Sequence, residues 1–374
     1  MTSLTLGGFC HPGYQAVQAA FEDNFRQGEE GGARFSLVRD GEVVVDLWAG
    51  WADKARTRPF GAQTLAPIFS TTKLVPALMI ARLVQAGRLD YAQPVADLWP
   101  EFAQNGKAAI TLEQVMSHQA GLSGFLEPMS ADLWFDTPAI CERLAAMAPL
   151  WPPGQASGYH PTTYGFLAGE IFRRVEGRSL GQAFHQDLAR PLDLDIWIGL
   201  PPAEHARVAE LTRPRGMARF GPQTPALKAA FQTVWAAPPG REEARWREAE
   251  IPSANGHASA LSLARLMGCL ATDGWLDGEQ VLGPSGVFDM ARTRCRGQDL
   301  VLPYEISWGA GVMRNEGLNI WGPGQETFGH AGWGGSCAFA DPERQLAGAY
   351  VMTRQSADLI GDPRARRLID AAYA

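Results

Sequence analysis

The strongest constraint on the fold is where strand-type and helix-type hydrophobic spacing occur along this 374-residue chain. Short β-prone runs occur near both ends, whereas residues 74–250 are dominated by helical spacing and loop signals. A sheet assembled from both ends, with a helical region inserted between them, is the most economical architecture for this order. We therefore expect an α+β fold with an antiparallel sheet flanked by helices and a mainly helical second region.

Both ends of the chain carry strand and helix signals. The run ARFSLVRDGEVVVDLWAG places two β-rich stretches around Asp40-Gly41, a dipeptide that suits a two-residue hairpin turn, and a helix is expected before it over about residues 14–28. Four further strands and a closing helix are expected later in the chain, at about residues 309–313, 325–332, 334–340, 346–352 and 363–373. These segments supply the sheet and its terminal helices.

The chain is longer than the roughly 250–300 residues at which a single hydrophobic core usually stops growing. We expect a discontinuous sheet domain made of residues 1–73 and 251–374, and a mainly helical domain made of residues 74–250. The stretch at about 212–250 is rich in Pro, Gly, Arg and Trp and lacks clean periodicity, which indicates a lid-like segment or a plain surface loop.

Charge and composition narrow the function classes. The net charge of -7 argues against a large nucleic-acid footprint, and no run approaches the roughly 18 apolar residues that a membrane span needs. The N-terminus lacks the basic start and apolar core of a secretory signal, so a cytoplasmic location is expected. The 5 cysteines are scattered without a C-x-x-C pair, and no zinc-type histidine pair or cofactor fingerprint occurs. No metal and no cofactor are therefore expected.

The first candidate for chemistry is the S-x-x-K sequence that runs from Ser70 to Lys73. Apolar residues on one side of the following segment predict a helix, in which Pro76 is tolerable if it falls within the first turn. A three-residue helical spacing brings the hydroxyl of Ser70 within reach of the amine of Lys73, which can activate it as a nucleophile. A lone S-x-x-K occurs often by chance, so this interpretation needs support from elsewhere in the chain.

A second candidate is Tyr159, which a Pro/Gly-rich loop places just before a helix in WPPGQASGYHPTTYGFLAGEIF. A phenol with a pKa near 10 is a poor base unless a neighbouring cation holds it as phenolate, and Lys73 can supply that charge. His160 is expected to line the site beside it. The alternative is that Tyr159 is a packed aromatic residue with a satisfied hydroxyl.

The third candidate is FGHAGWGGSCAFADPE, in which glycines surround His330 and Trp333 on a predicted strand. Glycines inside a strand commonly mark the close approach of another backbone or of a ligand. Such a strand can present a backbone N–H that forms an oxyanion hole together with the N–H of Ser70. The alternative is a glycine-rich bulge with a core tryptophan.

Together, the three candidates resemble, in order and spacing, the S-x-x-K, Y-x-N and K-T-G motifs of the serine β-lactamase and penicillin-binding-protein superfamily. Longer stretches are similar to class C β-lactamases and more closely to family VIII carboxylesterases: IFSTTKLVPALMIARLVQAGRLDYAQPVADLWPEF, ITLEQVMSHQAGLSG, NGHASALSLARLM and GHAGWGGSCAFADPE. The resemblance covers about residues 12–354 and implies a β-lactamase/transpeptidase-like fold with the site between the two regions.

The resemblance also implies roles for individual residues. Ser70 would be the nucleophile, Lys73 the residue that helps deprotonate it, and Tyr159 the second member of the base pair and proton donor to the leaving group. The backbone N–H groups of Ser70 and Trp333 would form the oxyanion hole. Substrate-binding positions would be His330, Gly332, Trp333 and His160.

Two departures from the amide-cleaving pattern point to the esterase branch. Pro161 stands where that pattern has Asn, and His330-Ala331-Gly332 stands where it has Lys-Thr-Gly. We expect a carboxylesterase that hydrolyses small, short-acyl esters through an acyl-enzyme on Ser70. Its partner would be a small-molecule ester, with neither nucleic acid nor membrane involved and with the oligomeric state left open.

Three alternatives remain open at this point. The chain could be a β-lactamase or D-Ala peptidase acting on amides, or a catalytically silent binding module that kept the fold. A different nucleophile, Ser179, satisfies the G-x-S-x-G pattern of α/β-hydrolases, but the segment before it predicts a helix where that pattern needs a strand. We therefore interpret Gly177 as a helix C-cap and Ser179 as the N-cap of the next helix.

Overall fold

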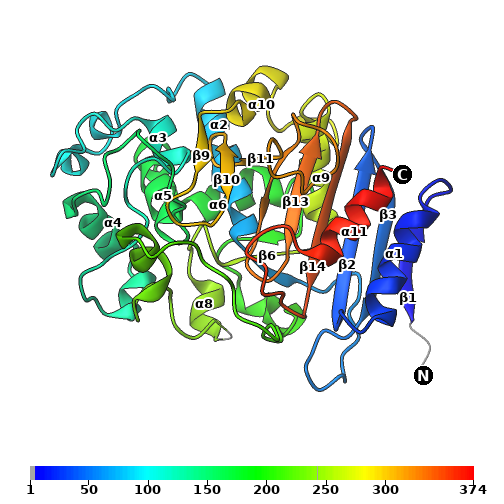
Figure 1. Ribbon diagram of the computed structural model, residues 1–374. Coiled ribbons are helices and arrows are strands. Elements are labelled where there is room, and N and C mark those ends of the chain that lie inside the picture. Colours follow the sequence, from blue (N-terminus) through cyan, green and yellow to red (C-terminus); the bar gives the residue numbers. More distant parts are fainter. Residues whose placement is uncertain (1–4, 242) are drawn as a thin grey trace.

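A nine-stranded antiparallel sheet forms from both ends of the chain in the computed structural model, which describes residues 5–241 and 243–374 (Figure 1). First and last segments meet in its middle, where Phe35 lies opposite Tyr350. The sheet confirms the expected α+β architecture. In spatial order its strands are β1 (Leu6–Cys10), β3 (Glu42–Gly50), β2 (Gly32–Arg39), β14 (Leu346–Met352), β13 (Cys337–Asp341), β12 (Phe328–Ala331), β11 (Met313–Arg314), β10 (Glu305–Trp308) and β9 (Cys295–Gln298).

The hairpin between β2 and β3 is confirmed where the sequence places it. Asp40 and Gly41 have φ angles of 53° and 83°, the left-handed values that a two-residue hairpin turn requires at both central positions. Asp tolerates this region better than most side chains, and Gly has no Cβ to clash there.

Helices cover both faces of the sheet. The predicted terminal helices, α1 (Gln15–Arg26) and α11 (Pro363–Ala372), contact each other and cross the same face, while α9 (Ala260–Ala271) packs on β14, β2 and β13 from the other (Figure 1). Alternate residues of β14 serve the two layers. Ala349 and Val351 join the core on the α9 side, whereas Tyr350 and Met352 join the core beneath α1 and α11.

The predicted strands in the last quarter of the chain are partly wrong in their bounds. Residues 309–312 form the turn between β10 and β11, because the N–H of Gly309 donates to the carbonyl of Val312 at 2.9 Å. Gly334 and Gly335 have φ angles of 92° and 124°, so they form a turn between β12 and β13 instead of belonging to a strand. Glycine makes both turns possible, so the glycines in these segments mark turns and not strand interiors.

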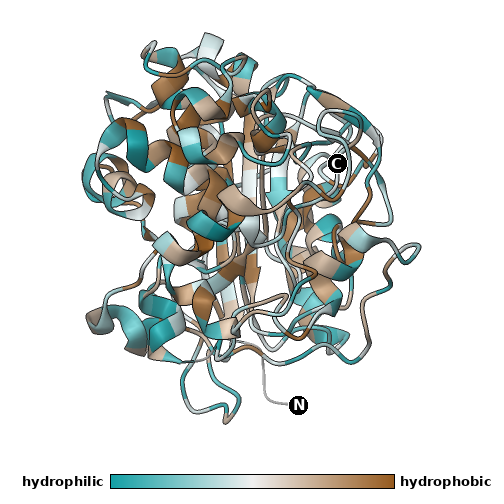
Figure 2. Cartoon of the chain, turned by 90° about the vertical axis from the view of Figure 1, so that its left-hand side faces the viewer, coloured by the Kyte–Doolittle hydropathy of each residue, from teal (hydrophilic) through white to brown (hydrophobic). Residues whose placement is uncertain are grey.

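The helical region lies beside the β9 end of the sheet and exposes its polar residues (Figures 1 and 2). Figure 2 shows brown, hydrophobic positions toward the interior of this region and teal positions on its outer turns. Its helices are α2 (Leu74–Gln85), α3 (Leu112–Met116), α4 (Thr137–Ala146), α5 (Thr163–Glu176), α6 (Leu180–Phe184), α7 (Pro225–Leu227) and α8 (Ala244–Glu248), and α10 (Pro284–Ala291) packs on α2. The domain boundaries at residues 73 and 250 stay a prediction.

A second, three-stranded antiparallel sheet joins the two regions. Its strands are β4 (Ala66–Phe69), β6 (Gly256–Ala258) and β5 (Ile196–Trp197), and a small hairpin, β7 (Trp275–Leu276) with β8 (Glu279–Gln280), lies apart from it. Strand β4 leads directly into the S-x-x-K segment. Within the described ranges, no helix has both the length and the apolar character to cross a bilayer.

Candidate active site

The nucleophile segment begins where β4 ends. Ser70 to Lys73 form one 3₁₀ turn that continues into α2, and Pro76 falls within the first turn of that helix. A 3₁₀ turn eclipses side chains three residues apart, so Lys73 Nζ lies 3.2 Å from Ser70 Oγ. Phe69, directly before the serine, has φ 44° and ψ -126°, a strained conformation for a residue with a side chain. The chain thus turns sharply at Phe69. Ser70, the next residue, is partly exposed.

Lys73 is completely buried and held by two carbonyl groups. Its Nζ donates to the carbonyl of Pro161 at 2.7 Å and to that of Ser253 at 2.9 Å. Burial lowers the pKa of Lys73 well below its usual value, because the charged form loses solvation. A neutral amine has two N–H groups and one lone pair. In this neutral form both N–H groups would donate to the two carbonyls, and the lone pair would face the hydroxyl of Ser70.

Tyr159 lies on the other side of the same hydroxyl. Its side chain hydrogen-bonds to Ser70, and Lys73 Nζ lies 4.8 Å from the centre of its ring. The ring stacks on Trp308 at 5.9 Å with planes 6° apart. Burial raises the pKa of Tyr159, which favours the neutral phenol. The structure therefore favours an amine and a phenol over the Lys73 ammonium and Tyr159 phenolate considered from the sequence.

His330 on β12 lines the same cavity as Ser70, and its ring is neutral. Its Nδ1 lies 2.7 Å from the carbonyl of Ala331, an acceptor, so Nδ1 carries the proton. Its Nε2 is buried and has no hydrogen-bond partner among the described residues. Burial lowers the pKa of His330 to about 3. The position that carries a lysine in the family pattern is therefore uncharged at neutral pH.

Trp333 and Gly332 follow the end of β12 but differ in their contacts. Trp333 lines the cavity, and its backbone N–H donates to no acceptor in the described part of the chain. Gly332 is not among the residues that line it, and its contact with substrate stays a prediction. The N–H of Gly332 donates to the carbonyl of Ser336, and a Cβ there would lie 2.2 Å from the carbonyl oxygen of Ile68. Because residue 332 is a glycine, β12 can approach β4 closely just before the nucleophile.

The structure places His160 in the core beside the loop that carries Tyr159. The ring is fully buried and does not line the cavity. Nδ1–H donates to the carbonyl of Gly158 at 2.6 Å, and Nε2 accepts from the N–H of Leu122 at 2.9 Å. Burial lowers the pKa of His160 to about 3. With both nitrogens engaged, His160 fixes the loop that carries Tyr159 and has no free group for a substrate. Its expected place in substrate binding stays a prediction.

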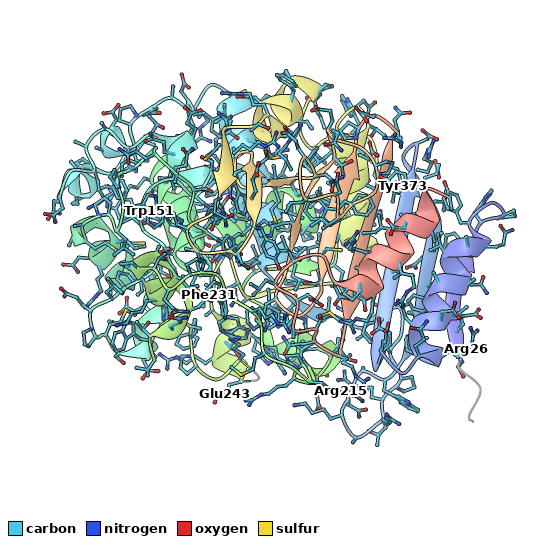
Figure 3. All side chains as sticks on the ribbon, viewed as in Figure 1. Arg26, Trp151, Arg215, Phe231, Glu243 and Tyr373 are labelled. Carbon is cyan, nitrogen blue, oxygen red and sulfur yellow. The ribbon has the colours of Figure 1, made fainter. Side chains whose placement is uncertain are left out.

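The cavity has a volume of about 260 Å³ and lies between the helical region and the sheet. Sequence reasoning missed several of its walls. Phe220 and Phe231, from the 212–250 stretch, form an aromatic cluster with Trp333, with ring centres 5.1–6.5 Å apart. In Figure 3 Phe231 is labelled nearer the middle of the molecule than Glu243 from the same stretch. Arg241 also lines the cavity, and its guanidinium lies 5.7 Å from the ring centre of Phe69.

Ser179 does not compete for the role of nucleophile. Gly177 ends α5 with φ 80°, and the side chain of Ser179 accepts from the N–H of Gln182 at the start of α6. Its hydroxyl donates to Glu250 at 2.7 Å. The cap interpretation made from the sequence is confirmed, and no lysine or histidine is in hydrogen-bond contact with this hydroxyl among the described residues.

Comparison with known proteins gives matches along nearly the whole chain. A family model described as Beta-lactamase matches residues 17–372. The chain is 37% identical over 370 residues to the curated protein "Esterase/beta-lactamase LipL" of Mycobacterium tuberculosis (strain ATCC 25618 / H37Rv), covering 94% of this chain and 84% of that one. A solved penicillin-binding protein homologue from Caulobacter crescentus is 60% identical with a TM-score of 0.97, covering 99% of each chain. A solved family VIII carboxylesterase is 40% identical with a TM-score of 0.92, again covering 99% of each chain.

Proposed function

Because the chain belongs to the Beta-lactamase family and is a serine hydrolase, we propose that it is a carboxylesterase that forms an acyl-enzyme on Ser70. One observation carries the proposal. Lys73 Nζ lies 3.2 Å from Ser70 Oγ, with two carbonyls occupying its other positions. A buried neutral amine aimed at a partly exposed hydroxyl is the arrangement that activates a serine nucleophile. The likeness to a family VIII carboxylesterase supports ester substrates.

In the acylation step, Ser70 Oγ attacks the ester carbonyl carbon while its proton moves to Lys73 Nζ. The negative charge that develops on the carbonyl oxygen would be stabilised by the N–H groups of Ser70 and Trp333. Preorganised donors of this kind each lower the barrier to acyl transfer by about 3–4 kcal/mol. Burial lowers the pKa of Lys73, which favours the neutral amine before the step and supports its role as the proton acceptor.

Collapse of the tetrahedral intermediate breaks the bond to the alkoxide. The phenol of Tyr159, hydrogen-bonded to Ser70, would give its proton to that alkoxide and recover one from the Lys73 ammonium. Water then attacks the acyl-enzyme by the same steps in reverse order, releasing the acid and restoring Ser70. The raised pKa of Tyr159 supports this residue as the proton donor, because its phenol is protonated when the alkoxide leaves.

The cavity supports small esters. Its volume of about 260 Å³ lies just below the range of about 300–1,000 Å³ typical of sites for drug-sized ligands. The aromatic cluster of Phe220, Phe231 and Trp333 gives it an apolar wall suited to a short acyl chain. We propose a short-acyl, small-molecule ester as the substrate on this basis. As further parts of the proposal, neither nucleic acid nor membrane takes part, and the protein acts in the cytoplasm.

A second candidate function, hydrolysis of anionic amides such as β-lactams, is favoured by Arg241. This residue is the one formally charged side chain among the described residues that line the cavity, and a carboxylate could pair with it. Against this candidate, His330 is neutral, and Pro161 offers only its carbonyl, which already accepts from Lys73. The loss of a charge-assisted hydrogen bond costs roughly 1.5–3 kcal/mol, or about ten- to hundredfold in affinity.

A substrate panel tests the proposal and separates the two candidates. The panel consists of p-nitrophenyl esters of rising acyl length, a chromogenic cephalosporin and penicillin G, assayed with the same enzyme preparation. We expect kcat/KM to peak at a short ester and to exceed the value for either β-lactam by at least about a hundredfold. Hydrolysis of a β-lactam as efficient as that of the best ester would replace the esterase assignment with the second candidate.

A further inference from the structure

Asp299, which follows β9, is a buried carboxylate with an unusual set of partners. Oδ1 accepts from the backbone N–H groups of Tyr159, Val301 and Leu302, each at 2.9 Å. Oδ2 accepts from the hydroxyl of Ser157 at 2.9 Å and from the indole N–H of Trp308 at 3.4 Å. One side chain thus ties together three parts of the chain, with Ser157 lying 142 residues from Asp299 in the sequence.

Tyr159 depends on this carboxylate for its position. Residues 156–160 belong to no helix or strand, so no regular hydrogen-bond ladder fixes the backbone that carries the phenol. The N–H of Tyr159 instead donates to Asp299, and the ring stacks on Trp308, whose indole N–H donates to the same carboxylate. Asp299 therefore positions both the backbone of Tyr159, directly, and its ring, through Trp308.

We propose that Asp299 is a positioning residue for ester hydrolysis, which holds the Tyr159 hydroxyl against Ser70 through the backbone of residue 159 and through Trp308. A carboxylate suits this role because all its partners are donors, and only an ionised group accepts on both oxygens without offering a proton. An amide in its place would keep one accepting oxygen and turn N–H groups toward at least one of these donors. A misplacement of about 1 Å at a reacting group can cost about a hundredfold in rate.

The test compares Asp299→Asn with a matched control, Asp46→Asn. Asp46 is equally buried, accepts from Arg34 and Ser36, and lies in the β2–β3 part of the sheet with no contact to Tyr159. Activity is measured with a short p-nitrophenyl ester at a temperature where circular dichroism shows both variants folded. We expect Asp299→Asn to lower kcat about 10- to 100-fold with KM changed less than about threefold, and Asp46→Asn to keep kcat within about twofold.

A double-mutant cycle with Tyr159→Phe decides whether Asp299 acts through Tyr159. In the Tyr159→Phe background, Asp299→Asn should cost less than about threefold in kcat. Equal losses in both backgrounds, an unchanged kcat in folded Asp299→Asn, or a similar loss in Asp46→Asn would each overturn the inference. If Asp299→Asn fails to fold, Ser157→Ala decides instead, because it removes one donor and leaves the carboxylate. A two- to fivefold loss of kcat supports the inference, and wild-type kcat overturns it.

The inference rests on the proposed role of Tyr159, and the two can fail separately. Tyr159→Phe with wild-type activity would remove the catalytic set and the inference with it. An inactive Tyr159→Phe beside an unaffected Asp299→Asn would leave the proposed function standing and remove only the positioning role.

Discussion

Gly332→Ala tests how closely the site depends on the contact between β12 and β4. A Cβ at this position would lie 2.2 Å from the carbonyl oxygen of Ile68, two residues before Ser70. It would also lie 2.3 Å from the hydroxyl of Ser336, which can rotate away, whereas the Ile68 carbonyl belongs to the backbone of β4. Widening the first contact to the 3.0 Å that a β-carbon requires displaces β12 or β4 by about 0.8 Å.

This displacement falls on the segments that carry Ser70 and Trp333. Because a shift of about 1 Å can cost about a hundredfold in rate, we expect Gly332→Ala to lower kcat/KM for a short p-nitrophenyl ester about 10- to 100-fold. Overpacking of this kind costs about 1–3 kcal/mol of stability, which thermal unfolding measures. Gly61→Ala is the control, since a Cβ there meets no atom within 4 Å. Wild-type kcat/KM in Gly332→Ala would refute the reasoning.

Three further predictions concern individual side chains. Ser70→Ala should abolish ester turnover while Ser179→Ala keeps it nearly intact, and equal losses in two folded variants would contradict the assignment. Tyr159→Phe should lower kcat/KM about 10²- to 10⁴-fold, the range of general acid–base catalysis, and a wild-type value would exclude its role. Burial lowers the pKa of His330 from 6.5 to about 3, so the unfolded state binds more protons between these values and stability falls as the pH drops through this window. Unfolding of His330→Gln followed from pH 7 to pH 4 should therefore show a shallower dependence than wild type, and an equal dependence would be inconsistent with a buried neutral His330.

Local signals in the sequence predicted the elements that local chemistry decides. Asp40-Gly41 fixed the hairpin because few residue pairs tolerate positive φ at both positions, and the spacing of Ser70 and Lys73 placed both groups on one turn. The order of strand-rich and helix-rich segments predicted the sheet built from both chain ends. Each of these features depends on neighbours in sequence or on a simple period.

Features that depend on contacts between distant segments were beyond the sequence. Adjacency to Tyr159 suggested that His160 faces the substrate, but the carbonyl of Gly158 and the N–H of Leu122 turn its ring into the core. The carbonyl of Ser253 holds Lys73, and a backbone acceptor leaves no residue-type signal. Asp299 is 140 positions from Tyr159, and nothing in the surrounding residues marks it as a partner.

The central claim, that this family member acts through an acyl-enzyme on Ser70, is tested most directly by covalent labelling. A fluorophosphonate reacts once with an activated serine and does not turn over, so peptide mapping by mass spectrometry identifies the nucleophile. We predict one adduct per chain, on the peptide that contains Ser70 and at Ser70 itself, with none in Ser70→Ala or after Lys73→Met. An adduct at another residue, together with ester hydrolysis that survives Ser70→Ala, would contradict the claim.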